Sequence, residues 1–248
     1  MPVTLWKRVQ ATSLWLPDGA AIAGRTAAYV WGVELADEDD PIEVASATRL
    51  RNGPGLLVRT IVVRPAEVTI HRGVRLTTPL HTAWELARAL PELDAIGWVD
   101  ALARRRRLTR KEFREHARSH WGEYGSRAAT STLECADPRA ESPPESRLRL
   151  SLLRAGLPVP VPQFTVLHDG FFVARVDLAW PAYRLAVEYD GQWHADGAQL
   201  HRDRSRLRDL LAAGWYVYPV TREDMRDISL LTREIGRILT ERRSLLEG

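Results

Sequence analysis

Apolar and polar residues alternate over three short runs in the second half of the chain, which is typical of half-buried strands. The third run, residues 184–190, carries large apolar side chains at every second position, and Glu188 and Asp190 share the opposite face. The other two runs cover residues 163–168 and 171–180. The Asp-Gly turn between those two predicts a hairpin.

Segments with a helical pattern precede and follow these strands. Ser142 and the two prolines after it predict a helix start, and Gly156 predicts its end. After the third strand we expect a helix over residues 198–213, a strand over 215–220 and a last helix over 227–246. A mixed sheet flanked by helices follows from this order, so the fold class is α/β or α+β.

The first part of the chain carries short β-branched runs and then becomes helical. Small residues from Gly19 to Trp31 predict a short helix before these runs. Thr78-Pro79 begins another helix, a third covers about residues 93–106, and Thr109 with Glu112 forms a capping-box pattern that begins a fourth. The β-branched runs predict a small antiparallel sheet and lie at residues 42–44, 58–63, 68–71 and 74–77.

Length and composition divide the chain. Its 248 residues exceed a typical domain of about 100–150 residues, and residues 136–144 are rich in proline and charge, as a linker is. We therefore expect two domains, residues 1–139 and 140–248. The single cysteine excludes an intramolecular disulfide. With no apolar run long enough to span a membrane and no signal core at the start, we expect no membrane partner and a cytoplasmic protein.

Carboxylates are expected to converge on the sheet of the second part. Asp177 faces away from its apolar neighbours on the second strand. A short turn follows that strand, which makes the second and third strands antiparallel and sets residue 177 beside 187 or 188. Acids this close favour a compensating cation, and oxygen ligands suit Mg²⁺ or Mn²⁺. His194, one short turn further on, has the side chain best suited to moving a proton near neutral pH.

These acids also have plain structural explanations. Acidic residues at strand ends often face solvent, and Asp190-Gly191 is an ordinary turn pair. Glu145 stands three residues after Ser142, where a capping box places an acid. The spacing alone leaves a metal site and a structural role open.

Five segments of the second part follow one another in a recognisable order. In order and spacing they resemble the very-short-patch-repair-like branch of the PD-(D/E)XK nuclease superfamily, and more closely its actinobacterial relatives of unknown function. The resemblance implies a restriction-endonuclease-like mixed sheet over about residues 142–225. The segments are Pro144–Arg149, Val176–Pro181, Val187–His194, Arg202–Arg204 and Leu211–Trp215.

The first part resembles a different family. It is similar to the region that precedes the nuclease-like part in AbiEi-type antitoxins, which implies a DNA- or partner-binding domain. The segments that carry this likeness are Leu16-Pro17, Ala27–Gly32 and Thr77–Thr82.

The nuclease resemblance assigns roles to individual residues. It makes Asp177 the principal metal ligand, Glu188 the second acid and Glu145 the helix acid that supports the metal or its water. The superfamily has a lysine two residues after the second acid, and in this chain Asp190 occupies that position. No lysine follows Lys111 in this chain. His194 matches a histidine of the mismatch-repair branch and becomes the expected general base or acid, with Asp190 as an extra ligand or as the group that orients the imidazole. The alternative is a site that binds metal or DNA without cutting.

Two arginine groups are candidates for DNA contact. Arg104, Arg105, Arg106 and Arg107 stand at the end of a predicted helix and begin a basic stretch that continues with Arg110, Lys111, Arg114 and Arg118. These residues either bind phosphates or, at the helix end, complement the helix dipole. Arg202, Arg204 and Arg206 follow the acidic patch, where they either clamp phosphates or form a solvated helix face.

His116 and His120 lie one helical turn apart and form a candidate metal pair. No acid or cysteine near them in the sequence completes a ligand set, which favours surface histidines.

The sequence thus predicts a Mg²⁺- or Mn²⁺-dependent DNA endonuclease or nickase, acting on single-stranded, nicked or mismatched DNA in repair or phage defence. The alternative is a non-catalytic, antitoxin-like DNA-binding regulator with a degenerate nuclease fold. A third hypothesis is a protein-binding partner of a toxin, and a homodimer would fit any of the three.

Overall fold

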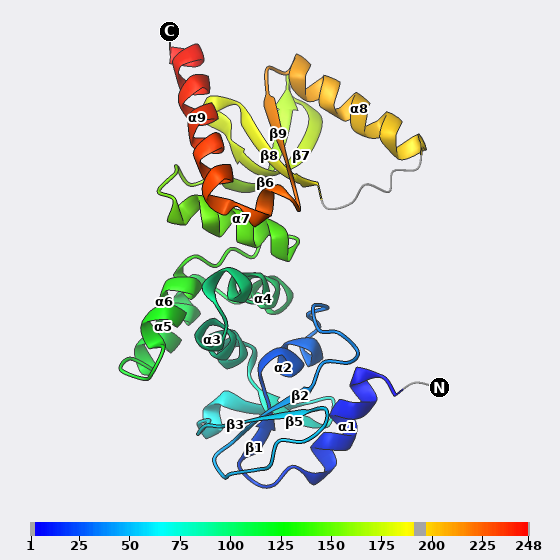
Figure 1. Ribbon diagram of the computed structural model, residues 1–248, viewed down its shortest axis with the longest axis vertical. Helices are drawn as coiled ribbons and strands as arrows, with labels where there is room; N and C mark the ends of the chain where they lie inside the picture. Colours follow the sequence, from blue (N-terminus) through cyan, green and yellow to red (C-terminus); the bar gives the residue numbers. More distant parts are fainter. Residues whose placement is uncertain (1–2, 191–196, 248) are drawn as a thin grey trace. The chain divides into compact units, whose positions relative to one another are not determined.

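The computed structural model describes residues 3–190 and 197–247, with the backbone alone for residues 197–203. The chain divides into two compact units, Met1–Pro138 and Arg139–Gly248, here called unit 1 and unit 2 (Figure 1). Each unit combines one mixed sheet with helices, which confirms the predicted α+β class.

Unit 1 contains a five-stranded sheet, and four helices, α3 to α6, follow its last strand in the sequence. The strand order is β3-β2-β1-β5-β4. Its elements are α1 (Leu5–Trp15), β1 (Ala20–Ile22), α2 (Gly24–Val30), β2 (Ile42–Ser46), β3 (Leu56–Thr60), η1 (Pro65–Glu67), β4 (Val68–His71), β5 (Val74–Thr77), α3 (Pro79–Ala89), α4 (Glu92–Arg106), α5 (Arg110–Ser119) and α6 (Ser126–Glu134).

Two expectations for unit 1 were wrong. The stretch from Gly19 to Trp31 is not one helix, because its first residues form β1, the central strand, and only the rest forms α2. Residues 20–22 are all buried, so the strand shows no alternation that would distinguish it from a helix. The sheet is also mixed rather than antiparallel, since β1 pairs in parallel with β5 and β2 with β3. Because β1 lies in the centre, β3 and β4, which follow one another in the sequence, form opposite edges of the sheet.

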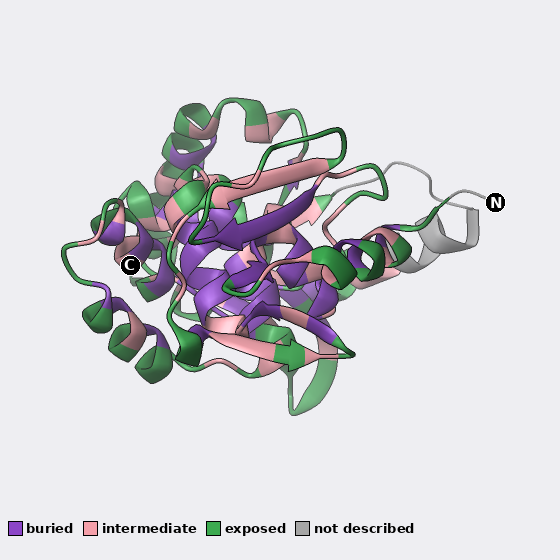
Figure 2. Cartoon of the chain, turned by 90° about the horizontal axis from the view of Figure 1, so that it is seen from below, coloured by how far each residue is buried: buried purple, intermediate pink, exposed green. Residues whose placement is uncertain are grey.

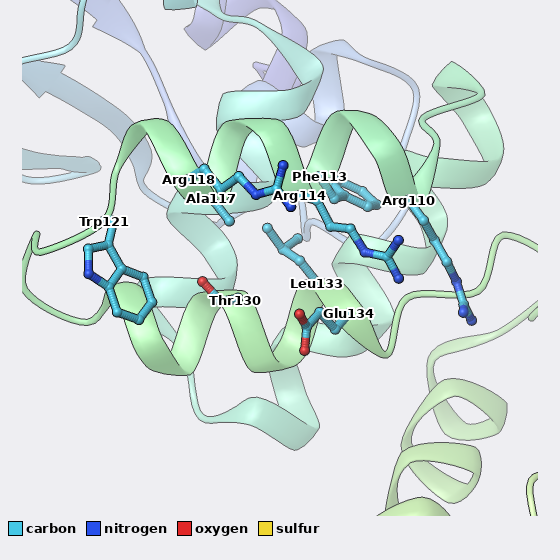
Figure 3. A pocket seen from close by; sticks show the side chains of 9 residues that line it. All are labelled: Arg110, Phe113, Arg114, Ala117, Arg118, Trp121, Thr130, Leu133 and Glu134. Carbon is cyan, nitrogen blue, oxygen red and sulfur yellow. The ribbon is translucent and has the colours of Figure 1, made fainter.

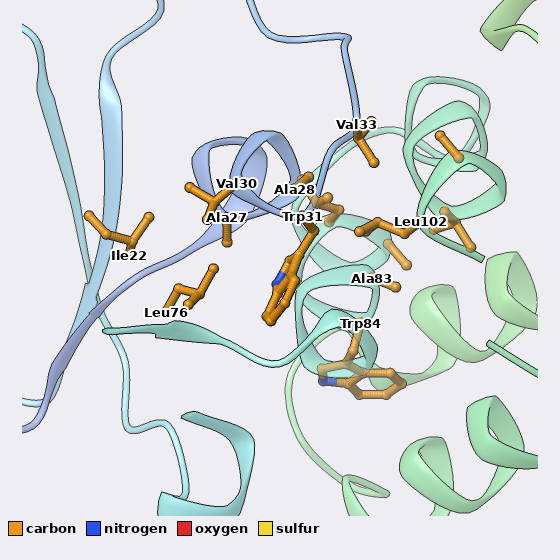
Figure 4. Close-up of a cluster of buried hydrophobic side chains, with 14 of the residues drawn as sticks. Ile22, Ala27, Ala28, Val30, Trp31, Val33, Leu76, Ala83, Trp84 and Leu102 are labelled. Carbon is orange, nitrogen blue, oxygen red and sulfur yellow. The ribbon is translucent and has the colours of Figure 1, made fainter. Parts of the chain in front are cut away.

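The core of unit 1 joins the sheet to the helices. Figure 4 shows Ile22 and Leu76 from the sheet, Ala27 and Val30 from α2, and Trp84 from α3 within one apolar cluster. Trp31 closes the end of α2, and its indole Nε1 donates to the carbonyl oxygen of Thr77 at 2.9 Å. The buried indole nitrogen is thereby satisfied while the ring fills the core.

Unit 2 is a four-stranded sheet covered by helices on both faces. The strand order is β6-β7-β8-β9, with β8 and β9 parallel and the other pairs antiparallel. Its elements are α7 (Pro143–Arg154), β6 (Val161–His168), β7 (Phe171–Trp180), η2 (Pro181–Tyr183), β8 (Leu185–Asp190), α8 (Gly197–Ala212), β9 (Tyr216–Thr221), η3 (Asp224–Arg226) and α9 (Ile228–Glu247).

The two faces of this sheet have separate cores. Leu148 of α7 and Ile235 of α9 pack with Leu178 on one face. On the other face, Leu210 of α8 packs with Ala186. Figure 2 shows the consequence for the helices, which are buried along one side and exposed along the other.

Within the described residues, every helix is too short or too polar to cross a lipid bilayer.

Candidate functional site

The pairing of β7 with β8 brings the expected acids together. Leu178 pairs with Val187, so the next residues along the two strands are Asp177 and Glu188. Opposite residues of an antiparallel pair share a face, and here that face is the one that α8 covers. A hollow of about 440 Å³ opens at this point, and residues of β7, β8, α8 and β9 line it, among them Asp177, Glu188, Asp190, Arg206 and Pro219.

Gln163 of β6 links two of the acids. Its side-chain Nε2 donates to Glu145 Oε2 at 2.8 Å and to Asp177 Oδ1 at 3.4 Å. The backbone of Gln163 is left-handed, with φ at 51°, and it interrupts the ladder between β6 and β7. This role was not predicted, since the alternating pattern marks Gln163 only as a strand residue.

The other oxygen of Asp177 accepts a hydrogen bond from the backbone N–H of Tyr189 at 2.9 Å. Burial raises the pKa of Asp177 to about 6, and the charges of Glu145 and Glu188 add to the rise, while the Tyr189 N–H works against it. A carboxyl with a raised pKa in a hollow is a common feature of functional sites.

Arg206 of α8 neutralises the second acid. Its terminal nitrogens bind both carboxylate oxygens of Glu188, one of them at 2.8 Å. One of these nitrogens also donates to the carbonyl oxygen of Arg175 at 2.9 Å. We expected Arg206 to contact phosphate, and in this structure its guanidinium holds a carboxylate.

Glu145 has the structural role that its spacing allows, and it also joins the acid group. The Ser142 hydroxyl donates to Glu145 Oε1 at 2.8 Å, and the backbone N–H of Glu145 lies 3.4 Å from that hydroxyl. Ser142 therefore holds one carboxylate oxygen at the start of α7, while the second accepts from the backbone N–H of Glu141 at 3.0 Å and from Gln163.

The remaining predicted residues of unit 2 are less enclosed. Asp190 is exposed at the rim of the hollow, and Arg204 is exposed on α8. His194 and the side chain of Arg202 lie outside the described residues. Their roles stay predictions.

The arginines at the end of α4 have structural contacts. The Arg106 guanidinium lies 4.4 Å from the centre of the Trp31 ring. Arg105 pairs with Glu34 at 3.3 Å, and Arg107 ends the helix in the left-handed conformation. Arg104 belongs to the same last turn, where a cation favours the helix dipole. Their role in DNA contact stays a prediction.

A more open cationic surface lies on α5, within the basic stretch of residues 104–118 that the sequence marks as a candidate for phosphate binding. Arg110, Arg114 and Arg118 are four residues apart and line one cavity of about 280 Å³, together with the exposed ring of Trp121 (Figure 3). We call these four residues the basic groove. Across residues 3–190 and 197–247, none of the three arginines takes part in a described ion pair. Their regular spacing was hidden by the other basic residues around them.

The expectation of surface histidines at 116 and 120 was wrong. His120 is buried and His116 is half-buried, because Glu67 and His81 come from distant parts of unit 1 to meet them. Neither of these partners was predicted, since both are remote from the histidine pair in the sequence.

Comparison with known proteins agrees with the resemblance of the first part. Residues 20–135 match the family described as AbiEi antitoxin C-terminal domain. Two proteins of Mycobacterium tuberculosis, from strains H37Rv and CDC 1551, are each 34% identical over 232 residues, which cover 93% of this chain and 83% of theirs. Both are called uncharacterized proteins, and no solved structure matches. The chain therefore belongs to one family with these mycobacterial proteins, and within unit 1 its residues 20–135 match the AbiEi antitoxin C-terminal domain family.

Proposed function

We propose that this protein acts in the cytoplasm as a DNA-binding regulator of the antitoxin type. The observation that carries the proposal is the basic groove, which lies on α5 within the segment that matches the antitoxin family. Three arginines one helical turn apart present their guanidinium groups along one line.

The chemistry of the groove suits a nucleic acid. Guanidinium groups bind phosphate oxygens through paired hydrogen bonds. Trp121 is 68% exposed and offers an aromatic face beside them, which is the arrangement that stacks an unpaired base. The groove thus combines contacts to the phosphate backbone with one contact to a base.

The contacts in unit 2 favour binding without cutting. Arg206 compensates Glu188 and the amide of Gln163 separates Glu145 from Asp177, so the protein itself reduces the charge that a metal would otherwise neutralise. The second half of the chain also has no lysine for the position that the nuclease superfamily uses.

Salt-dependent DNA binding tests this proposal. Fluorescence anisotropy with a labelled duplex would compare the wild type with Arg110→Ala/Arg114→Ala/Arg118→Ala at several salt concentrations. We expect the triple variant to bind at least about tenfold more weakly at low salt. In a plot of the logarithm of the binding constant against the logarithm of the salt concentration, the magnitude of the slope should fall by about 0.9 for each phosphate that the variant no longer neutralises.

The matched control removes the same charge elsewhere. Arg226, Arg237 and Arg243 are exposed and paired locally with glutamates in unit 2, and the triple change of these residues to alanine should leave binding near the wild-type level. Equal binding by the two triple variants would reject the groove as the DNA surface. A lack of DNA affinity in the wild type would favour the toxin-binding alternative.

A second candidate function is a Mg²⁺- or Mn²⁺-dependent DNA endonuclease or nickase. The convergence of Asp177 and Glu188 on one hollow favours it, and Gln163 joins Glu145 to Asp177. The oxygen donors suit such an ion. Asp177 and Glu188 would hold it, and Arg206 would have to release Glu188 first. The ion would supply charge neutralisation and an activated water.

The other predicted residues complete this candidate. His194 would move the proton, Asp190 would assist, and Arg202 with Arg204 would hold phosphates. Supercoiled, nicked, mismatched and single-stranded DNA would be incubated with the protein and Mg²⁺ or Mn²⁺. We expect Asp177→Asn to abolish cleavage, whereas Asp169→Asn, in the exposed turn of the β6–β7 hairpin, should not. Cleavage that survives Asp177→Asn would reject this site.

A further inference from the structure

Four metal-ligating side chains meet in the interior of unit 1. Glu67 ends η1, His81 lies in the first turn of α3, His116 lies on α5 and His120 follows its last residue. One oxygen or nitrogen atom from each lies within 4.8 Å of those of the other three. We call these residues the His-Glu cluster.

Two distances that involve His81 match those between neighbouring ligand atoms of a tetrahedral site. His81 Nδ1 lies 3.3 Å from His116 Nε2 and 3.4 Å from Glu67 Oε2. Bonds of about 2.0–2.1 Å to a tetrahedral ion place neighbouring ligand atoms about 3.3–3.4 Å apart. His120 Nε2 lies nearer to Glu67 Oε1, at 2.8 Å, and would move by about half an ångström to reach the same spacing.

Backbone contacts already orient two of the ligands. His120 Nδ1 lies 2.9 Å from the carbonyl oxygen of His116, to which it donates, so a metal would bind His120 through Nε2, which in this structure pairs with Glu67 Oε1. Glu67 Oε2 accepts a hydrogen bond from the backbone N–H of Arg64 at 3.0 Å. Contacts of this kind hold the ligands in many metal sites.

We propose that Glu67, His81, His116 and His120 form a binding site for a divalent transition metal of the zinc type. Three imidazole nitrogens and one carboxylate oxygen are a ligand set that zinc accepts in tetrahedral geometry. With four protein ligands and three of them buried, no position remains for a water or a substrate. The site is structural in kind, since a hydrolytic zinc site keeps an open position.

The electrostatic surroundings are compatible with a cation. The Arg64 guanidinium lies 3.9 Å from Glu67 Oε1. Glu123 pairs with Arg64 at 3.1 Å and with Arg88 at 3.2 Å. The two guanidinium groups are thus partly compensated by an acid beside the cluster.

A bound ion would join elements that are far apart in the sequence. It would fasten the turn before β4 to the start of α3 and to the end of α5, the helix that carries the basic groove. We therefore expect zinc to raise the melting temperature of unit 1.

The test uses the untagged full-length chain, freed of metal with a chelator and dialysed. Isothermal titration with Zn²⁺ should show one site per chain. The variants Glu67→Gln and His116→Ala should each weaken binding by about 100-fold or more, and His168→Ala, which removes an exposed histidine, should bind as the wild type does. Circular dichroism of the metal-free variants checks their folding.

A second measurement needs no variant. Co²⁺ in a tetrahedral site absorbs visible light far more strongly than six-coordinate Co²⁺, so the wild-type protein with one equivalent of Co²⁺ should show intense absorption that Zn²⁺ removes. Weak six-coordinate absorption would overturn the proposal, as would zinc binding that is equal in the wild type and in both folded variants.

Discussion

Arg206 and Glu188 form a two-pronged ion pair between α8 and β8, in which two guanidinium nitrogens contact the two oxygens of one carboxylate. The pair is only partly exposed, with 35% of the arginine side chain and 20% of the glutamate side chain accessible. It connects the helix that covers the hollow to the strand that carries the acids. The stability of this part of unit 2 should therefore depend on it.

Removing the cation should expose the repulsion among the acids. We expect Arg206→Gln to lower the free energy of unfolding by about 1–2 kcal/mol, because Glu188 then lies beside Asp177 without its partner. The double variant Arg206→Gln/Glu188→Gln should recover most of the loss. Urea unfolding measures both, and Arg237→Gln serves as control, since its exposed pair should contribute less than about 1 kcal/mol. A loss no larger than that of the control would contradict the expectation.

The raised pKa of Asp177 predicts a pH-dependent stability. Because its pKa rises from 3.8 to about 6 on folding, the folded state binds more protons between these values, and the free energy of unfolding falls as pH rises through that window. Asp177→Asn removes this dependence. We expect the variant to be more stable than the wild type by about 2–3 kcal/mol at pH 8 and similar to it near pH 4. Urea unfolding over this pH range measures the difference. A difference between the two proteins that stays constant with pH would reject the assignment.

Gln163 should be intolerant of a charge. Gln163→Glu adds a carboxylate at hydrogen-bonding distance from Glu145 and near Asp177. We expect a loss of about 1–3 kcal/mol in unfolding free energy at pH 8, with partial recovery at pH 5, where one of the acids regains a proton and donates a hydrogen bond. Gln10→Glu, on the exposed face of α1, makes the same chemical change and should be nearly neutral. Equal effects at the two positions would show that the amide is not needed between the acids.

Alanine substitutions at Gly24 and Gly19 distinguish the cost of a packing clash from the cost of backbone strain. A methyl group at this position would overlap the Glu43 carboxylate, which is buried and pairs with Arg25 and Arg59. Gly19 has the same left-handed sign of φ, and no atom lies within 4 Å of an added methyl group there. We expect Gly19→Ala to cost about 1 kcal/mol and Gly24→Ala about 3 kcal/mol or more, as measured by thermal or urea unfolding. Similar losses would mean that Glu43 moves aside without cost.

Local patterns were sufficient wherever the determining contacts are close in the sequence. Thr109 and Glu112 form the predicted capping box, and Ser142 caps the helix that holds Glu145. The strand from Phe171 to Trp180 has the predicted limits. The facing of Asp177 and Glu188 also follows from a short turn, because the length of the turn fixes the pairing of the strands.

The sequence by itself determined the class of fold, the capped helix starts at Thr78, Thr109 and Ser142, and the meeting of two acids. Each of these rests on contacts between residues a few positions or one hairpin apart. Only the tertiary structure decided which groups surround them. Gln163 enters the acid group because a left-handed residue turns its amide toward Asp177. Glu67 and His81 reach His120 because the sheet and helices of unit 1 pack around one core, and such packing leaves no periodic trace in the sequence.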